Sequence, residues 1–312
     1  MPAPIYIGID AGGSKTELQA EAGNSTFRQI GDGVNFQRDG AARSTDVFSL
    51  LIAEAFEALE HDGTGSICLG VAGTGRLEGR LSLAEHLRQR LGASLGSYVF
   101  TVEHDAHIAL EAAFEGESGM LVIAGTGSIV LARTTANALE RAGGWGPRVG
   151  DDGSGTAIGM AGLSAVAASF DGGEPTTLST YLATELGITS PEGLIHTVYT
   201  DTWTVQALAP LVVAAAEEGD SVCERILTTQ ADALAQRARW LVARAHDITP
   251  RVALMGGIAS EAHYRACLTE ALRRHLPGWQ VVHPSCRPVD GALSLARKLG
   301  PENRDQEIDS GG

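Results

Sequence analysis

The sequence predicts an α/β protein with two domains. Apolar runs of strand length alternate with segments of helical period along much of the chain, a pattern typical of mostly parallel sheets flanked by helices. Three of these runs end in glycine turns, at Gly12, Gly125 and Gly256. Another strand follows each of the first two turns, which indicates a duplicated module. With 312 residues, the chain has the length of two domains of about 150 residues each.

Amino-acid composition and net charge limit the classes of ligand that the protein is expected to bind. Glycine accounts for 39 of the 312 residues, well above the usual share of about 7%, and so many glycine turns close to a ligand are expected. The net charge is −15 and the sequence contains no run of Lys or Arg. Both facts argue against a nucleic-acid partner, which requires a basic patch.

The cysteines and the N-terminal segment indicate the compartment. No C-x-x-C motif and no Cys/His spacing typical of zinc occurs, so we expect reduced, mostly buried thiols. The first residues are typical of a strand rather than a signal peptide, and no apolar run reaches about 18 residues. We therefore expect a cytoplasmic protein with no membrane partner. The four thiols are Cys68, Cys223, Cys267 and Cys286.

The first glycine turn follows an apolar strand at residues 5–9 and carries one carboxylate and one ammonium. Its glycines allow backbone N–H groups to approach an anion, while Asp10 offers oxygen to a hard cation. An ordinary strand–turn–strand is the alternative interpretation. A Walker A loop is excluded, because Ser14 separates Gly13 from Lys15 and a strand follows. The candidate anion-binding residues are Gly12, Gly13, Ser14, Lys15 and Thr16.

The next part of the chain places two polar residues beside helices. Asn35 lies on a loop that precedes a predicted helix. Asp105 lies where a strand ends and a helix begins, so the helix N–H groups and macrodipole favour its ionised form, although a plain N-cap is the alternative. The expected strands are residues 16–22, 27–30, 66–71 and 98–102, and the expected helices are 41–59, 77–91 and 106–114.

A second strand and glycine turn repeat the opening pattern. The strand at 120–124 runs into Gly125-Thr126-Gly127-Ser128, and strands at 129–133 and 139–142 follow. The turn fails the dinucleotide pattern, since the last glycine position falls on Val130. Two such turns in one chain indicate that both face the same phosphate-bearing ligand.

A loop at residues 143–155 is too rich in glycine for a regular element and is therefore a candidate functional loop. Trp145 could stack on the apolar face of a ring, and Asp151 or Asp152 could accept hydrogen bonds from hydroxyls. The alternative is a Trp that caps the core and two solvated acids.

The C-terminal half is mainly helical. A third glycine junction, Gly256-Gly257, follows the strand 251–255 and could hold a planar base against bare backbone. His104, His107 and Glu111 share helical spacing, but we do not expect zinc there. The expected helices are 156–169, 176–186, 191–199, 205–216, 221–246, 260–275 and 290–299, with a strand at 280–283 and a frayed tail at 301–312.

Together these motifs resemble the N-acetylglucosamine/glucosamine kinase family, within the superfamily of sugar kinases, actin and heat-shock-chaperone ATPases. Residues 8–16 resemble its first phosphate motif, 125–128 its second, 255–257 its adenosine motif, 103–106 the segment with the catalytic aspartate, and 143–154 its sugar loop. One departure is Asp152, where relatives commonly have Glu.

The resemblance implies two ribonuclease-H-like lobes, each a mixed sheet flanked by helices, with ATP in a cleft between them. It implies an N-terminal lobe at 1–104 joined by the C-terminal helix 289–300, and a second lobe at 105–288. The expected reaction is phosphorylation of the 6-hydroxyl of an amino sugar, with Asp105 as base, Asp10 at Mg²⁺ and a homodimer as an expected assembly. Sugar contacts are expected from Asn35, Asp105, Thr126, Gly144, Trp145 and Asp151.

Two other functions are weighed against this one. An ATPase that activates a radical dehydratase through an iron–sulfur cluster needs closely placed cysteines, and those here are scattered. A sugar-sensing transcription repressor needs a DNA-binding segment ahead of the first strand, which begins near residue 4. The sequence does not distinguish among glucosamine, N-acetylglucosamine, N-acetylmuramic acid and glucose as substrates.

Overall fold

The computed structural model describes residues 3–61, 64–92, 98–200 and 204–300. The chain forms two compact units, one of Met1–Glu117 with Pro284–Gly312 and the other of Ser118–His283. The expected boundary after residue 104 thus lies one helix too early, because α3 (Asp105–Phe114) packs against α11 (Pro288–Leu299) in the first unit. The expected tail at 301–312 lies outside the described residues.

The first unit is built on a mixed sheet with the strand order β3-β2-β1-β4-β5. The central strand β1 pairs antiparallel with β2, which pairs antiparallel with β3. On its other side β1 pairs parallel with β4, which pairs parallel with β5. The central strand is apolar because helices cover both faces of the sheet. The strands are β1 (Ile5–Ala11), β2 (Lys15–Ala22), β3 (Ser25–Asp32), β4 (Gly65–Val71) and β5 (Tyr98–His104).

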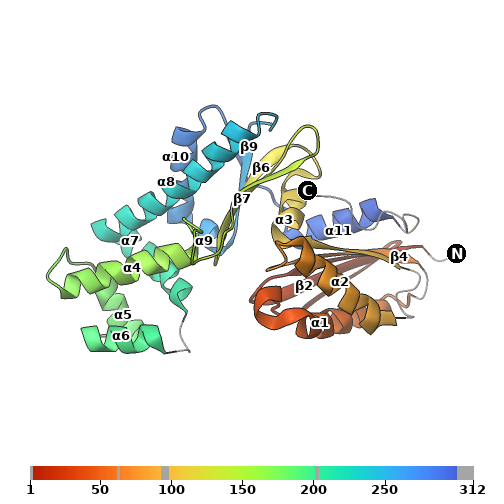
Figure 1. The fold of residues 1–312 in the computed structure, drawn as a ribbon, viewed down its shortest axis with the longest axis horizontal. Coiled ribbons are helices and arrows are strands. Elements are labelled where there is room, and N and C mark those ends of the chain that lie inside the picture. The colour runs from red at the N-terminus through yellow and green to blue at the C-terminus, as the bar shows by residue number, and fades with distance from the viewer. Residues whose placement is uncertain (1–2, 62–63, 93–97, 201–203, 301–312) are drawn as a thin grey trace. The chain divides into compact units, whose positions relative to one another are not determined.

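Helices α1 (Phe36–Ala58) and α2 (Leu77–Leu91) cover one face of this sheet, while α3 and α11 cover the other (Figure 1). Helix α1 begins earlier than the expected residue 41. Asn35 caps it, and Gly40, with a φ of 72°, interrupts it after its first turn. The expected start therefore corresponds to the residue after this kink.

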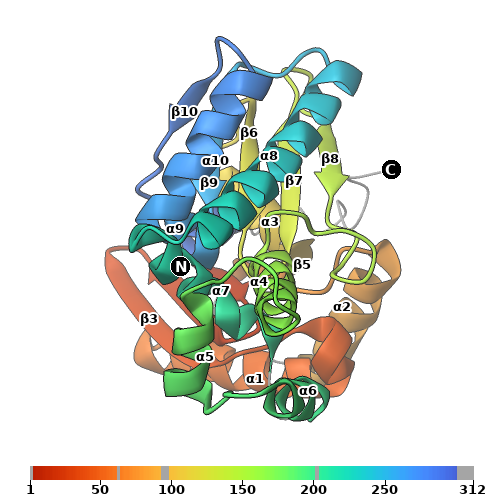
Figure 2. The ribbon, with the colours of Figure 1, turned by 90° about the vertical axis from the view of Figure 1, so that its left-hand side faces the viewer.

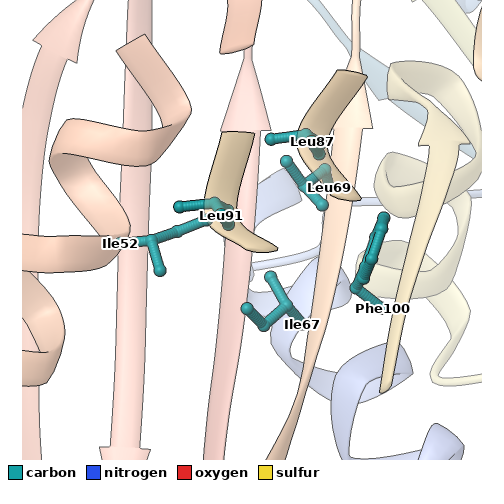
Figure 3. A pocket seen from close by; sticks show the side chains of 6 residues that line it. All are labelled: Ile52, Ile67, Leu69, Leu87, Leu91 and Phe100. Atoms are coloured by element: carbon teal, nitrogen blue, oxygen red, sulfur yellow. The ribbon is translucent and has the colours of Figure 1, made fainter. Parts of the chain in front are cut away.

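The core under α2 is entirely apolar. Figure 3 shows its side chains around a small gap between α1, α2 and the sheet. No polar group lines this gap, so it offers nothing to orient a ligand and we assign it to core packing. The lining residues are Ile52, Ile67, Leu69, Leu87, Leu91 and Phe100.

On the opposite face, the C-terminal helix approaches the sheet very closely. A Cβ atom at Gly8 would lie 2.3 Å from the backbone nitrogen of Leu293, and one at Gly291 would lie 2.0 Å from the carbonyl oxygen of Ile108. Only glycine fits at these two contacts, which bring α11 onto both β1 and α3.

The second unit repeats the sheet of the first, in the order β10-β9-β6-β7-β8. Again a central strand has an antiparallel hairpin on one side and two parallel strands on the other. The shared topology confirms the predicted pair of mixed sheets. The strands are β6 (Gly119–Ala124), β7 (Ser128–Arg133), β8 (Leu139–Gly143), β9 (Arg251–Met255) and β10 (Gln280–Val282).

Helices α8 and α10 lie side by side in the second unit (Figures 1 and 2). Two expected helices are each divided in the structure. The segment 205–216 is a 3₁₀ turn, Val205–Leu208, followed by α7, and 260–275 is the end of α9 followed by α10. The helices are α4 (Gly155–Phe170), α5 (Leu178–Leu186), α6 (Pro191–Tyr199), α7 (Ala209–Glu217), α8 (Ser221–Arg244), α9 (Gly257–Ser260) and α10 (Ala262–His275).

None of the helices in the described part of the chain is both long and apolar enough to cross a membrane.

Candidate active site

Two carboxylates lie at the carboxyl ends of strands in the first sheet. Asp10 is the penultimate residue of β1, and Asp105 follows β5 as the first residue of α3. Because β1, β4 and β5 are parallel, these positions share one edge of the sheet. This is the edge at which ligands bind in open α/β sheets.

Asp10 is partly buried and has an unusual proton affinity. Burial, together with the nearby carboxylates of Asp105 and Glu17 and against the opposing effect of Lys15, raises its pKa from the ordinary 3.8 to about 7. Three acids near one another favour either a proton or a bound cation. The position therefore suits a metal ligand.

Asp105 is held in its ionised form by its neighbours. Burial opposes ionisation, but hydrogen bonds from His104 and from the amide of Ala106 outweigh it and lower the pKa of Asp105. Its Oδ1 lies 2.9 Å from the Ala106 nitrogen, and its side chain is 39% exposed. A carboxylate that is ionised, oriented and accessible can accept a proton from a substrate.

His104 controls this arrangement and was not predicted as a site residue. Its Nδ1 lies 3.0 Å from Asp105 Oδ1 and 3.1 Å from the Ala106 nitrogen. With a proton on Nδ1, the ring donates to Asp105, and with the proton on Nε2 it accepts from Ala106. The expected helical neighbours of His104 pair elsewhere, His107 with Glu103 and Glu111 with Lys298.

The first glycine turn exposes the expected anion-binding residues Gly13, Ser14 and Lys15. It is closed by a hydrogen bond from the Gly12 amide to the Lys15 carbonyl, 3.0 Å long. Thr16 differs from expectation, since its buried hydroxyl donates to the Asp32 carbonyl at 2.6 Å. This hydroxyl holds the hairpin together rather than facing a ligand.

Arg38 links this turn to the loop that carries Asn35, a role that the sequence reasoning missed. Its guanidinium donates to the Gly13 carbonyl at 3.2 Å and pairs with Asp39 at 2.8 Å. Asp39 in turn accepts from the backbone nitrogen of Asn35 at 2.8 Å. The Asn35 side-chain oxygen accepts from the Gln37 amide, at 3.0 Å, and caps α1.

The second glycine turn lies against the start of α4. The Gly125 amide donates to the Gly127 carbonyl at 2.9 Å, and the Gly155 amide donates to the Gly125 carbonyl at 2.7 Å. Thr126 is exposed at the tip of the turn. Ser128 is buried and its hydroxyl donates to the Asp152 carbonyl at 2.7 Å, so this hydroxyl also differs from the expected ligand-facing donor.

The third glycine junction adjoins the second turn. Gly256 has a φ of 107°, and a Cβ atom there would lie 2.3 Å from the Ala124 carbonyl oxygen. Gly257 is exposed, and a Cβ on Gly125 would lie 3.9 Å from its nitrogen. The structure thus brings the expected phosphate and adenosine motifs of the second unit together as bare backbone.

The glycine-rich loop is ordered by Asp151. This residue is buried with a φ of 63°, and its Oδ1 accepts from the Gly146 amide at 3.0 Å. Burial raises the pKa of Asp151 against these backbone hydrogen bonds. Trp145 is 59% exposed, with the Arg141 guanidinium 4.8 Å from its ring centre, and Gly144 packs on Ile129. The aromatic ring is therefore presented to solvent rather than to the core.

Asp152 has a structural partner that explains its place in the loop. Its Oδ2 pairs with the Arg237 guanidinium of α8 at 2.5 Å. Together with the bond from Ser128 to its carbonyl, this ion pair ties the loop to both β7 and α8. Asp152 is shorter than the Glu that relatives commonly have here, but it still forms an ion pair that anchors the loop.

Comparison with known proteins gives relatives that cover almost the whole chain. It is 30% identical to the N-acetyl-D-glucosamine kinase of Dictyostelium discoideum, over 95% of this chain and 98% of that protein. It is 32% identical to the N-acetylmuramic acid/N-acetylglucosamine kinase of Clostridium acetobutylicum, over 93% and 97%. These relatives confirm the resemblance drawn from the motifs.

Solved structures agree in fold. A proposed N-acetylglucosamine kinase of Chromobacterium violaceum superposes with a TM-score of 0.74 at 25% identity, and the match covers 94% of this chain and 99% of that one. A model of the BadF/BadG/BcrA/BcrD ATPase family matches residues 7–296. The chain therefore belongs to the BadF/BadG/BcrA/BcrD ATPase family, with the two-lobed actin-like ATPase fold.

Proposed function

We propose that this protein is an ATP-dependent kinase that phosphorylates the 6-hydroxyl of an amino sugar, N-acetylglucosamine or glucosamine. The observation that carries the proposal is the similarity to N-acetylglucosamine kinases along almost the entire chain. The site residues agree with this reaction, because kinase catalysis depends mainly on positioning and electrostatic stabilisation.

In this proposal Asp105 is the catalytic base. It accepts a hydrogen bond from the 6-hydroxyl, orients the oxygen and takes its proton as the phosphoryl group is transferred. The low pKa of Asp105 makes it a weak base. A weak base suffices because the hydroxyl becomes strongly acidic only late in a loose phosphoryl-transfer transition state.

Asp10 is the proposed Mg²⁺ ligand. Its pKa is raised mainly by burial and further by the carboxylates of Asp105 and Glu17, and a hard divalent cation relieves the repulsion among these acids better than a proton does. When bound, Mg²⁺ neutralises charge on the phosphates of ATP. Asp10 contributes an oxygen ligand and, by proximity, keeps the cation near Asp105.

The two glycine turns are the proposed phosphate-binding elements. In the first, the exposed amides of Gly13 and Ser14 and the ammonium of Lys15 supply donors. In the second, the amides of the 125–127 turn and the Thr126 hydroxyl do so. Thr16 and Ser128 support these turns from the buried side, and Gly256 and Gly257 form the backbone surface for the adenosine.

The sugar is proposed to bind Asn35, Gly144, Trp145 and Asp151. The cap on α1 uses only the oxygen of the Asn35 amide, which leaves Nδ2 for a sugar hydroxyl. Arg38 and Asp39 hold that loop in place. The exposed ring of Trp145 offers a stacking surface of the kind that sugar rings use.

A coupled assay of ADP release tests the proposal with MgATP and four sugars. We expect the largest kcat/KM for N-acetylglucosamine or glucosamine, ahead of N-acetylmuramic acid and glucose. A preference for glucose, or ADP release that no sugar stimulates, would overturn the substrate assignment. Sedimentation and cell fractionation test the two remaining parts of the proposal, a homodimer and a cytoplasmic location.

No described contact favours the dehydratase-activating ATPase. Cys68 and Cys223 are buried, and Cys267 and Cys286 lie in different units. A coloured protein after anaerobic purification would revive that alternative.

A further inference from the structure

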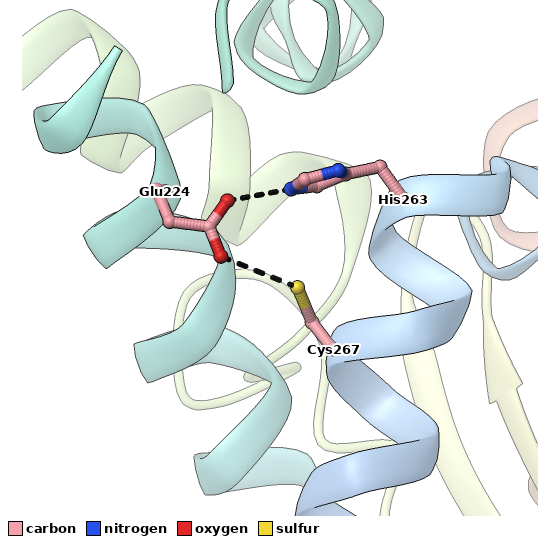
Figure 4. Close-up of side chains that lie close together, drawn as sticks. All are labelled: Glu224, His263 and Cys267. Carbon is pink, nitrogen blue, oxygen red and sulfur yellow. Dashed lines mark hydrogen bonds and ion pairs between the residues drawn. The ribbon is translucent and has the colours of Figure 1, made fainter. Parts of the chain in front are cut away.

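Three side chains that the proposed reaction does not use lie together in the second unit, between α8 and α10 (Figure 4). His263 Nε2 is 2.5 Å from one oxygen of Glu224, and the Sγ atom of Cys267 is 3.9 Å from the other. The potential ligand atoms all lie within 4.8 Å of one another. A nitrogen, a sulfur and an oxygen thus converge on one point.

Helical geometry fixes this convergence. His263 and Cys267 are four residues apart on α10, so they project from the same face, and Glu224 projects from the first turn of α8. Both helices pack closely along this face. The cluster is therefore presented by two rigid elements rather than by a loop, as a precise ligand site requires.

The spacing is close to that of a tetrahedral metal site. Zinc bonds to nitrogen, oxygen and sulfur measure about 2.0–2.3 Å, which places ligand atoms roughly 3.3–3.8 Å apart. The observed separations of 2.5 and 3.9 Å lie on either side of this range. Metal binding would therefore replace the hydrogen bond between His263 and Glu224, separate their ligand atoms and draw the Cys267 sulfur slightly inward.

We propose that Glu224, His263 and Cys267 bind a divalent transition-metal ion of the zinc class, with a fourth position open to water. The thiolate and imidazole exclude hard cations such as Mg²⁺, which prefer oxygen ligands. Binding removes the proton of the Cys267 thiol to solvent and forms a metal–sulfur bond. The ion enters from solvent, since His263 is 30% and Glu224 44% exposed.

The same two helices contain a matched control. His275 Nε2 lies 2.9 Å from Asp232 Oδ1, and these residues again come from α10 and α8. This pair lacks a thiol, and Arg274 already neutralises its carboxylate at 3.1 Å. It tests whether any histidine–carboxylate pair on these helices binds metal, or only the cluster that contains Cys267.

The test is calorimetric titration of the reduced, metal-free, full-length protein with Zn²⁺, together with absorbance on titration with Co²⁺. We expect one saturable site and a thiolate-to-Co²⁺ charge-transfer band. Cys267→Ser and His263→Ala should each weaken binding at least about tenfold and Cys267→Ser should abolish the band. His275→Ala and Cys286→Ser should change neither.

Absence of saturable binding by the wild-type protein would overturn the proposal. So would a band and an affinity that persist in Cys267→Ser, because they would place the metal elsewhere. Cys267→Ser replaces one atom and keeps a hydrogen-bond donor, so it tests the site even if His263→Ala fails to fold.

Discussion

The central strands of the two sheets, β1 and β6, both lead into a glycine turn, but they carry different side chains there. In the first unit, Asp10 pairs across the hairpin with Glu17, and Ala11 with Thr16. At the corresponding places in the second unit, Ile123 pairs with Ile129, and Ala124 with Ser128. The backbone scaffold is therefore shared, whereas the carboxylates belong to the first unit alone at this position.

This difference indicates how the two units of a duplicated fold can contribute different chemical groups to a kinase site. A glycine turn supplies backbone donors in both units, because N–H groups do not depend on side-chain identity. Charge costs stability when it is partly buried, as the raised pKa of Asp10 shows. We infer that the first unit carries the acid chemistry and that both units supply backbone donors to the nucleotide.

The largest expected effect tests the acid chemistry of the first unit. Asp105→Asn should lower kcat about 10²–10⁴-fold, because an amide cannot accept the hydroxyl proton. Steady-state kinetics with saturating sugar and MgATP measure it. Glu21→Gln, which removes a surface carboxylate paired with Arg297, is the control and should leave kcat unchanged. Turnover of Asp105→Asn within about threefold of wild type would contradict the assignment.

The next largest effect is expected for alanine substitutions at the glycines that follow β4 and β9. Gly73 and Gly256 have φ values of 85° and 107°, and an added Cβ would lie 2.6 Å from Asn35 Oδ1 or 2.3 Å from the Ala124 carbonyl. Each Ala substitution should cost at least about 1–3 kcal/mol. Gly256→Ala should raise the KM for ATP, and Gly73→Ala the KM for the sugar.

Gly172→Ala is the matched control for these two variants. Its φ is 88°, but an added Cβ meets nothing within 4 Å. It should lose stability through its backbone conformation alone and leave both KM values unchanged. If Gly73→Ala and Gly256→Ala raised the same KM, the proposed positions of Asn35 at the sugar and of Gly256 at the adenosine could not both hold.

A smaller effect, the change of folding stability with pH at a buried carboxyl, has opposite signs in the two units. The folded protein keeps the Asp10 proton up to about pH 7, whereas the unfolded chain releases it near 3.8. Stability therefore falls as the pH rises through this window. Asp10→Asn should be about 1–2 kcal/mol more stable than wild type at pH 8 without Mg²⁺, with no difference near pH 3, as measured by urea unfolding.

Asp220 in the second unit provides the contrast. Burial opposes its ionisation, but hydrogen bonds, including one from the Cys223 amide, outweigh it and lower its pKa to about 2. Its stabilising effect is present above pH 3.8 and is lost as the pH falls through 2. Asp220→Asn should cost about 1–2 kcal/mol at pH 8, because it replaces the oxygen that accepts hydrogen bonds from Thr176 and Thr177. A gain in stability there would contradict this account.

The smallest effect concerns the sugar loop. Trp145→Ala should raise the KM for the sugar roughly two- to tenfold, as expected for the loss of about 0.5–1.5 kcal/mol of ring contact, with little change in the KM for ATP. Trp240→Ala is a close control, because Trp240 is also half exposed and lies under an arginine, Arg237, at 5.1 Å. Equal changes in both KM values for Trp145→Ala would contradict its placement.

Much of the fold could be predicted because strand and helix periods are local. One of the two divided helices carried a local signal that the periodicity concealed. Pro210 sits in the first turn of α7, where its missing N–H costs nothing, and so it marks a helix start. Glu261 has extended dihedral angles between α9 and α10, and no residue type nearby indicates this break.

The inward hydroxyls of the candidate site could also have been predicted. Strand alternation places Thr16 on the same face as Leu18 and Ala20, both fully buried. Other contacts had no local signal. Arg38 reaches Gly13 across 25 positions of sequence and Arg237 reaches Asp152 across 85, so only the folded chain brings them together.

The return of α11 to the first sheet has a consequence for biosynthesis. The second unit is continuous, from Ser118 to His283, and so its whole chain is synthesised before α11. The first unit begins earlier but needs α11 against Gly8 and α3 to cover its sheet. Since domains fold as units during synthesis, the second unit is completed first, and a nascent first sheet has only α3 on this face until α11 is made.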